Sequence, residues 1–175
     1  ALALERHYSV PPGEVGKSLG VIVLATTLGC LPFAGVFDRL LTTRLRLAAR
    51  PAIMATCTAI TIPLVLVLGS AGALQGAFIA LGFALYLSNS ANALVPTMIQ
   101  DLVPNALRAR CFALWSFTVS VFGACGPLLA GMLSDQVFGG DMLHAIIVTA
   151  IPAMAMSLLC ALRLFMLARA RPSPR

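Results

Sequence analysis

Five polar residues interrupt a long apolar stretch, residues 74–100, within one short segment: Tyr86, Ser88, Asn89, Ser90 and Asn92. Tyr86, Asn89 and Ser90 are three and four residues apart, so a helix places them on one face. Hydroxyl and amide groups at membrane depth need hydrogen-bond partners or a hydrated cavity. Tyr86, Asn89, Ser90 and Asn92 are therefore candidates for contact with a bound solute. The alternative is hydrogen bonding between helices, worth about 0.6 kcal/mol per pair.

A group of charged residues follows the first apolar stretch. It begins Gly35-Val-Phe-Asp38-Arg39 and continues to Arg44 and Arg46. A carboxylate at the C-terminal end of a helix is unfavourable for the helix dipole unless it meets a cation or another helix N-terminus. We therefore expect Asp38 to pair with an arginine or to cap a neighbouring helix. A solvated loop carboxylate is the alternative.

Residue types that serve catalysis or metal binding form no recognisable site in the sequence. The five cysteines make no CxxC or CxxH pair, and His7 and His144 have no partner at ligand spacing. HExxH, GxSxG and glycine-rich phosphate-binding motifs are missing. The sequence therefore predicts no metal site, no cofactor and no enzyme.

The composition indicates a membrane protein. Of the 175 residues, 59% are apolar and 10% are charged, and the mean hydropathy is +0.95. A soluble domain usually has about 25% charged residues. The net charge of +6 does not indicate nucleic-acid binding, because the basic residues stand in short gaps between long apolar runs.

Five apolar stretches are long enough to cross a bilayer, which takes a helix of about twenty residues. The predicted spans are residues 18–37, 51–70, 74–100, 111–134 and 143–162, with 163–175 as a tail. The expected fold is all-α, a polytopic membrane helix bundle in a single domain. Residues 1–4 are apolar but too short to cross, so we expect them to end another helix of a longer or processed protein.

The basic residues predict the orientation of the bundle. With five spans, residues 38–50, residues 101–110 and the tail share one side, which holds every basic residue except Arg6 and Lys17. Cytoplasmic loops carry an excess of lysine and arginine. We therefore expect a multi-pass protein of the cell inner membrane with its N-terminus outside and its C-terminus in the cytoplasm.

The fourth span contains residues that favour close helix packing. Gly123, Gly126 and Gly131 recur at near-helical spacing, and small residues let two membrane helices approach closely. Pro127 is expected to bend the span.

These segments together resemble the major facilitator superfamily of secondary transporters. Gly35, Asp38, Arg39 and Arg44 resemble its cytoplasmic motif between helices eight and nine, although residues 40–43 replace the usual glycine-basic ending. Pro104 and Arg108, followed by a span with Gly126-Pro127, resemble the turn between helices ten and eleven. Residues 126–135 are similar to bacterial spinster-like members.

The resemblance implies the C-terminal half of a transporter, helices eight to twelve with the end of helix seven. Such a half contributes to alternating access, here of a small organic or amphiphilic substrate. The implied cytoplasmic gate consists of Gly35, Asp38, Arg39, Arg44 and Arg108. Expected partners are the lipid bilayer, the N-terminal six-helix half or another copy, and the small-molecule substrate, but no nucleic acid. The alternative is a small standalone membrane protein that acts as a packing or assembly partner without transport.

Overall fold

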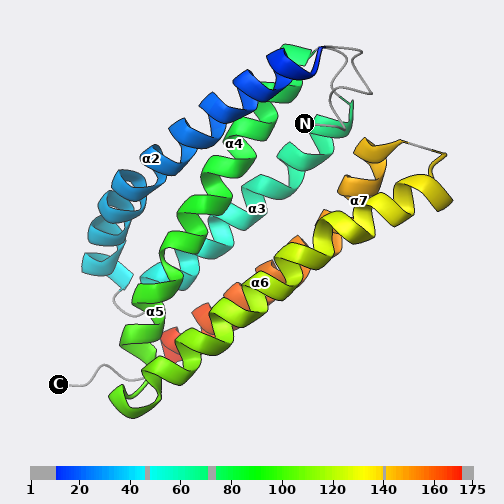
Figure 1. Cartoon of the computed structure of the whole chain (residues 1–175). Coiled ribbons are helices and arrows are strands. Elements are labelled where there is room, and N and C mark those ends of the chain that lie inside the picture. Colours follow the sequence, from blue (N-terminus) through cyan, green and yellow to red (C-terminus); the bar gives the residue numbers. More distant parts are fainter. Residues whose placement is uncertain (1–10, 46–47, 71–73, 140, 171–175) are drawn as a thin grey trace.

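The computed structural model describes residues 11–45, 48–70, 74–139 and 141–170, and every regular element there is a helix (Figure 1). The elements are α2 (Pro12–Leu45), α3 (Ala49–Ser70), α4 (Leu74–Ala93), α5 (Val95–Leu102), α6 (Asn105–Gln136) and α7 (Met142–Ala170). Five segments are long and apolar enough to cross a membrane, with α4 and α5 together forming one of them, Leu74–Leu102. The predicted all-helical fold is confirmed, as is the number of segments long and apolar enough to cross a membrane.

The helices extend beyond the predicted apolar stretches. α2 has 34 residues and α6 has 32. Hydropathy marks only the part of a helix that suits hydrocarbon, whereas backbone hydrogen bonding continues into the polar flanks. The additional turns at the ends of these helices carry charged residues such as Arg39, Arg44, Arg108 and Asp135.

The third span is interrupted, although the sequence predicts one stretch over residues 74–100. α4 ends at Ala93 and α5 begins at Val95. Pro96 has no N–H to donate, and its ring crowds the carbonyl four residues earlier, so an α-helix breaks there. The N–H of Leu94 instead bonds the Ala91 carbonyl at 3.2 Å, in a tighter turn. This break gives α5 its own direction below α4 (Figure 1).

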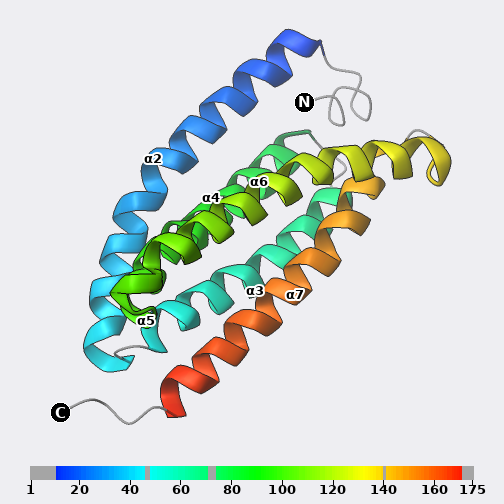
Figure 2. The same cartoon turned by 60° about the horizontal axis from the view of Figure 1, so that its bottom comes forward.

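α3 stands at the centre of the packing, between α4 and α7. α3 and α7 run side by side (Figure 2), α2 packs against α4, and α6 packs against α7. Alanines make much of the buried core, as in the cluster of Val15, Leu68, Ala77, Ala80 and Leu143. Small side chains permit the short helix–helix distances on which membrane bundles rely.

α6 leaves its apolar surface open. None of the residues in its most apolar stretch is buried, and Phe122 is 72% exposed. In an aqueous protein such a surface would be a liability, whereas lipid or another apolar helix covers it at no cost.

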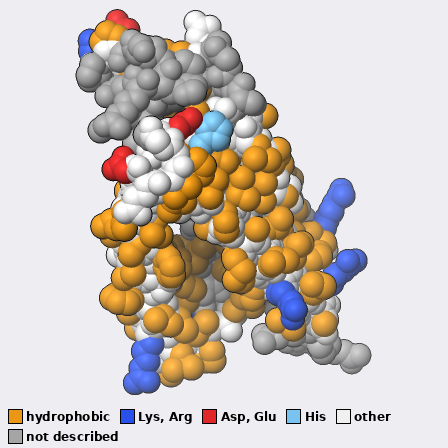
Figure 3. All heavy atoms as spheres, turned by 90° about the vertical axis from the view of Figure 1, so that its right-hand side faces the viewer, with side chains coloured by type: hydrophobic (Ala, Val, Ile, Leu, Met, Phe, Trp, Pro, Cys, Tyr) orange, Lys and Arg blue, Asp and Glu red, His pale blue; other side chains and the backbone are white. Residues whose placement is uncertain are grey.

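Basic residues are divided unequally between the two ends of the bundle, and Figure 3 shows acidic side chains near one end and most basic side chains near the other. Because successive long helices alternate in direction, one end carries Arg39, Arg44, Arg50, Arg108, Arg110, Arg163 and Arg169. The opposite end carries Glu14, Lys17, Asp135 and Asp141. Arg6, Arg46, Arg171 and Arg175 lie outside the described residues.

Candidate functional site

An ionic cluster joins three helices at the arginine-rich end. The Arg50 guanidinium, at the start of α3, donates from Nε to Asp38 Oδ1 at 2.9 Å and from Nη2 to Asp38 Oδ2 at 3.0 Å. Its Nη1 bonds the Asp101 carboxylate and lies 3.4 Å from the Thr97 carbonyl oxygen. Asp38 belongs to α2, and Asp101 and Thr97 belong to α5. We call Asp38, Arg50 and Asp101 the latch.

Partial burial strengthens the latch. The Arg50 and Asp38 side chains are 18% and 23% exposed, and Asp101 is 45% exposed. A bidentate guanidinium–carboxylate pair is the strongest common ion-pair geometry, and it gains strength as water is excluded. The Thr42 hydroxyl also donates to Asp38 Oδ1, at 3.2 Å. The latch therefore fixes the end of α2 against α3 and α5, with its weaker bond at Asp101.

The expectation that Asp38 pairs with an arginine is confirmed, and the partner is Arg50. Arg39 and Arg44 are exposed, and neither forms an ion pair with any described residue. The Arg108 Nε donates to the Val103 carbonyl at 3.0 Å, within the turn between α5 and α6. The structure therefore brings one of the predicted gate residues, Asp38, into the latch.

Gly35 has no neighbouring atom within 4 Å of where a Cβ would stand. Arg50 and Asp101 were not singled out from the sequence. Each is a lone charged residue at the edge of an apolar span, and an unpaired charge at that depth signals a partner on another helix.

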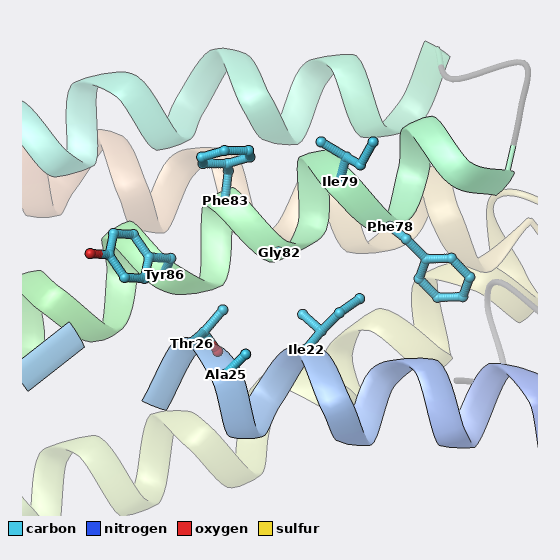
Figure 4. A pocket seen from close by; sticks show the side chains of 8 residues that line it. All are labelled: Ile22, Ala25, Thr26, Phe78, Ile79, Gly82, Phe83 and Tyr86. Atoms are coloured by element: carbon cyan, nitrogen blue, oxygen red, sulfur yellow. The ribbon is translucent and has the colours of Figure 1, made fainter. Parts of the chain in front are cut away.

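An apolar groove of about 450 Å³ lies between α2 and α4 (Figure 4). Its lining residues are Ile22, Ala25, Thr26, Phe78, Ile79, Gly82, Phe83 and Tyr86. The Thr26 hydroxyl donates to the Val23 carbonyl at 3.0 Å, so its hydrogen is committed to its own helix. The groove offers aromatic and aliphatic surface, and the Tyr86 ring stands at one end with its hydroxyl directed away from the other lining residues (Figure 4).

The position of Tyr86 depends on a glycine in α2. A Cβ on Gly29 would stand 3.0 Å from Tyr86 Cε2, which is closer than side chains normally approach. The Tyr86 ring also meets Phe33 edge to face, with centroids 5.2 Å apart. Gly29 thus admits the ring that closes one end of the groove, and neither it nor the α2 side of the groove was singled out from the sequence.

The predicted solute-contact residues point to different surroundings. Tyr86 lines the α2–α4 groove. Ser90 is 0% exposed and donates to the Tyr86 carbonyl at 2.7 Å, so it is satisfied within α4. Asn92 lines a different hollow, between α3, α4 and α7. Asn89 is half-buried and lines neither space.

The glycines of α6 face open space. No atom lies within 4 Å of a Cβ built at Gly123, Gly126 or Gly131, and Pro127 stands inside the helix. The close helix contact predicted for these residues is therefore not made to any described helix. A close helix contact at a glycine is found instead at Gly69 of α3, where an added Cβ would collide with the Ile147 side chain of α7.

The described residues contain no group of three histidine, cysteine or acidic side chains placed to hold a metal ion. All five cysteines are free. His144 Nδ1 lies 2.8 Å from Asp141 Oδ2 near the end opposite the latch, and His7 lies outside the described residues.

The chain matches no protein-family model, no curated protein and no solved structure. The latch and the α2–α4 groove are therefore the features from which a function is inferred.

Proposed function

We propose that this chain is the C-terminal half of a secondary active transporter of the major facilitator type, which moves a small organic or amphiphilic solute by alternating access. The observation that carries the proposal is the bridge from Arg50 to Asp38 and Asp101. Alternating access requires contacts at one membrane face that form in one state and separate in the other. The latch joins the ends of three helices on one side of the bundle, so it is suited to be such a contact.

The latch is suited to reversible opening. Its three side chains are partly exposed, so water replaces the lost bonds when they separate. The free-energy difference between closed and open states can then be a few kcal/mol, the range in which a bound solute shifts the population. A fully buried cluster would lock the bundle, since breaking a buried pair by itself costs about 3–5 kcal/mol.

The α2–α4 groove supports an apolar or amphiphilic substrate. Its lining contains three aromatic rings, Phe78, Phe83 and Tyr86, and no charged side chain. A sugar or a polyanion would lose its hydration there without gaining hydrogen bonds. The Tyr86 ring bounds one end of the groove, so the surface offered to a solute is almost entirely apolar.

A second candidate function is that of a packing or assembly partner without transport. The open surface of α6 favours it, since Gly123, Gly126 and Gly131 leave space along one helix. In the transporter proposal the same surface receives a helix of the other half. The two functions differ in whether the groove changes its exposure between the two sides of the membrane.

Thiol accessibility of a Tyr86→Cys variant tests the proposal without knowledge of the substrate. The variant is made in the full-length protein in a cysteine-free background and treated with a membrane-impermeant maleimide in inside-out and right-side-out vesicles. Alternating access predicts labelling from both sides. Adding Asp38→Asn or Arg50→Gln opens the latch and is expected to increase labelling from the cytoplasmic side by several-fold.

Arg39→Gln is the matched control, because Arg39 is an adjacent, exposed arginine outside the latch. It is expected to leave the labelling ratio unchanged. Labelling from one side only, with no response to Asp38→Asn or Arg50→Gln, would favour the packing partner and rule out the gate.

A further inference from the structure

A second hollow, of about 300 Å³, lies between α3, α4 and α7. It is separate from the α2–α4 groove because the two spaces use different faces of α4. Ser88, which lines the hollow, follows Tyr86 of the groove by two residues, and about 100° per residue turns it to the opposite side of the helix. The hollow therefore opens on a face of the bundle different from the one that α2 covers, and its lining residues Asn92, Ala153 and Ser157 are exposed.

Half of the residues that line the hollow are polar. Five of its side chains carry a hydroxyl or an amide: Thr58, Thr61, Ser88, Asn92 and Ser157. They come from three helices that are each long and apolar enough to span a membrane. Hydroxyl and amide groups at this depth require partners, since lipid chains offer none.

Two of these groups have their hydrogens committed. The Thr58 hydroxyl donates to the Met54 carbonyl at 2.9 Å, and the Thr61 hydroxyl donates to the Cys57 carbonyl at 2.8 Å. Thr61 is 2% exposed, so its oxygen is fixed in the wall of the hollow. A hydroxyl oxygen that donates its hydrogen retains lone pairs. The two threonines therefore present acceptors.

The other three groups have no hydrogen-bond partner among the described residues: Ser88, which is half-buried, and Asn92 and Ser157, which are exposed. Each can both donate and accept. Leaving such a group unpaired in an apolar environment costs about 1–3 kcal/mol. These three groups line one space, so they are available to a polar occupant of it.

The lining also limits the charge of that occupant. None of its residues is ionisable at neutral pH, the remaining members being alanines, Met54 and Met154. An ion would have to lose its hydration without a counter-charge, which is far more costly than burying a neutral polar group. The volume lies at the small end of ligand pockets, which begin at about 300 Å³.

We propose that the hollow between α3, α4 and α7 is a binding site for a small uncharged solute with several hydroxyl or amide groups. The threonines accept hydrogen bonds from the solute, and Ser88, Asn92 and Ser157 exchange hydrogen bonds with it. The site does not depend on the transport proposal, because it uses neither the latch nor the α2–α4 groove.

The test compares two neighbouring thiols on α7 in the full-length, cysteine-free protein in lipid nanodiscs. Ser157→Cys places a thiol in the hollow. Met156→Cys places one at the same depth on a side chain that is 64% exposed outside it. The rate of labelling by N-ethylmaleimide is measured with glycerol and with myo-inositol at increasing concentration. Glycerol phosphate serves as the charged comparison.

The Ser157→Cys thiol is expected to react, because a hydrated space supports the thiolate. Glycerol or myo-inositol is expected to slow the reaction along a saturating curve, by about tenfold at ten times the dissociation constant, since only the empty site reacts. Met156→Cys is expected to show no saturable slowing, and glycerol phosphate no protection.

Thr61→Val removes a wall acceptor while keeping the side-chain volume, and Thr61→Ser restores the hydroxyl. In the Ser157→Cys background, Thr61→Val is expected to abolish protection and Thr61→Ser to retain it. If the Thr61→Val variant does not fold, the protection curve of Ser157→Cys with native Thr61 still tests whether the hollow binds the solute. A thiol as unreactive as Met156→Cys means a lipid-filled hollow, and a reactive thiol without saturable protection means one that holds only water. Either result overturns the proposal.

Discussion

Arg50 bonds the carboxylates of both Asp38 and Asp101, so its loss removes more hydrogen bonds than the loss of either aspartate. Removing it leaves Asp38 and Asp101 without their shared cation, two like charges at one helix junction. Removing Asp101 leaves the bidentate bond to Asp38 in place. The three latch residues should therefore differ in how much they stabilise the fold.

We expect Arg50→Gln to lower the free energy of unfolding most, by about 1–3 kcal/mol, because it strands a partly buried carboxylate. Asp38→Asn is expected to cost less, and Asp101→Asn less than about 1 kcal/mol, since Asp101 is largely solvated. The free energy of unfolding of Arg50→Lys should lie between those of wild type and Arg50→Gln, because lysine keeps the charge but cannot form the bidentate pair with Asp38. Thermal unfolding in detergent ranks the variants. An Arg39→Gln control that destabilises as much as Arg50→Gln would contradict the latch.

For single residues, the sequence predicted that Asp38 requires a cation but did not predict which arginine supplies it. A carboxylate at the end of the first apolar stretch requires a cation, and Arg39, Arg44 and Arg50 all stand within reach along the chain. Only the rotation of α3 against α2 selects Arg50. The same holds for Tyr86: the sequence identified it as a candidate residue, but its close contact with Gly29 depends on how α2 and α4 pack.

Among the elements, α7 shows a local rule at its start. The Asp141 Oδ1 accepts hydrogen bonds from the backbone N–H groups of Leu143 and His144, at 3.1 and 3.2 Å. These are the N-cap bonds that satisfy the first free amides of a helix. The hydrogen bond from the His144 side chain lowers the pKa of Asp141. The folded state thus favours the carboxylate.

We expect Asp141→Ala to cost about 1 kcal/mol at neutral pH, and Asp141→Asn to cost little because asparagine also caps. A lowered pKa gives stability that is present above the ordinary value for aspartate, about 3.9, and lost as the pH falls through the folded value. The melting temperature of wild type relative to Asp141→Asn should therefore fall below about pH 4. The effect is small, since the side chain is largely solvated. A difference that stays constant down to acid pH would contradict it.

The boundary between α4 and α5 was not predicted from the sequence. Averaged hydropathy joins residues 74–100 into one span, while Pro96 breaks the helix by a local steric effect. That break lets α5 bring Thr97 and Asp101 to Arg50. The proline was visible in the sequence, but the direction that α5 takes after it depends on the packing of its neighbours.

For the whole molecule, the separation of charge predicts its orientation in the membrane. The described arginines all lie at the latch end, where Asp38 and Asp101 pair with Arg50, whereas Glu14, Asp135 and Asp141 lie at the other end. Single cysteines at Thr43 and Gln136, both exposed near opposite ends, report the orientation. In intact cells an impermeant maleimide is expected to label Gln136→Cys and not Thr43→Cys until the cells are opened. The reverse pattern would place the latch outside and remove it as a cytoplasmic gate.

The sequence by itself determined the class of the protein, the number of long apolar helices and the unequal charge of their two ends. These follow from chain length and composition, because a bilayer fixes how many apolar residues a helix needs and where basic residues stand. Tertiary structure alone decided that Arg50 is the partner of Asp38. It also placed Tyr86 and Asn92 in separate spaces. Helical periodicity relates residues within one helix, but the rotation of each helix against its neighbours comes only from their packing.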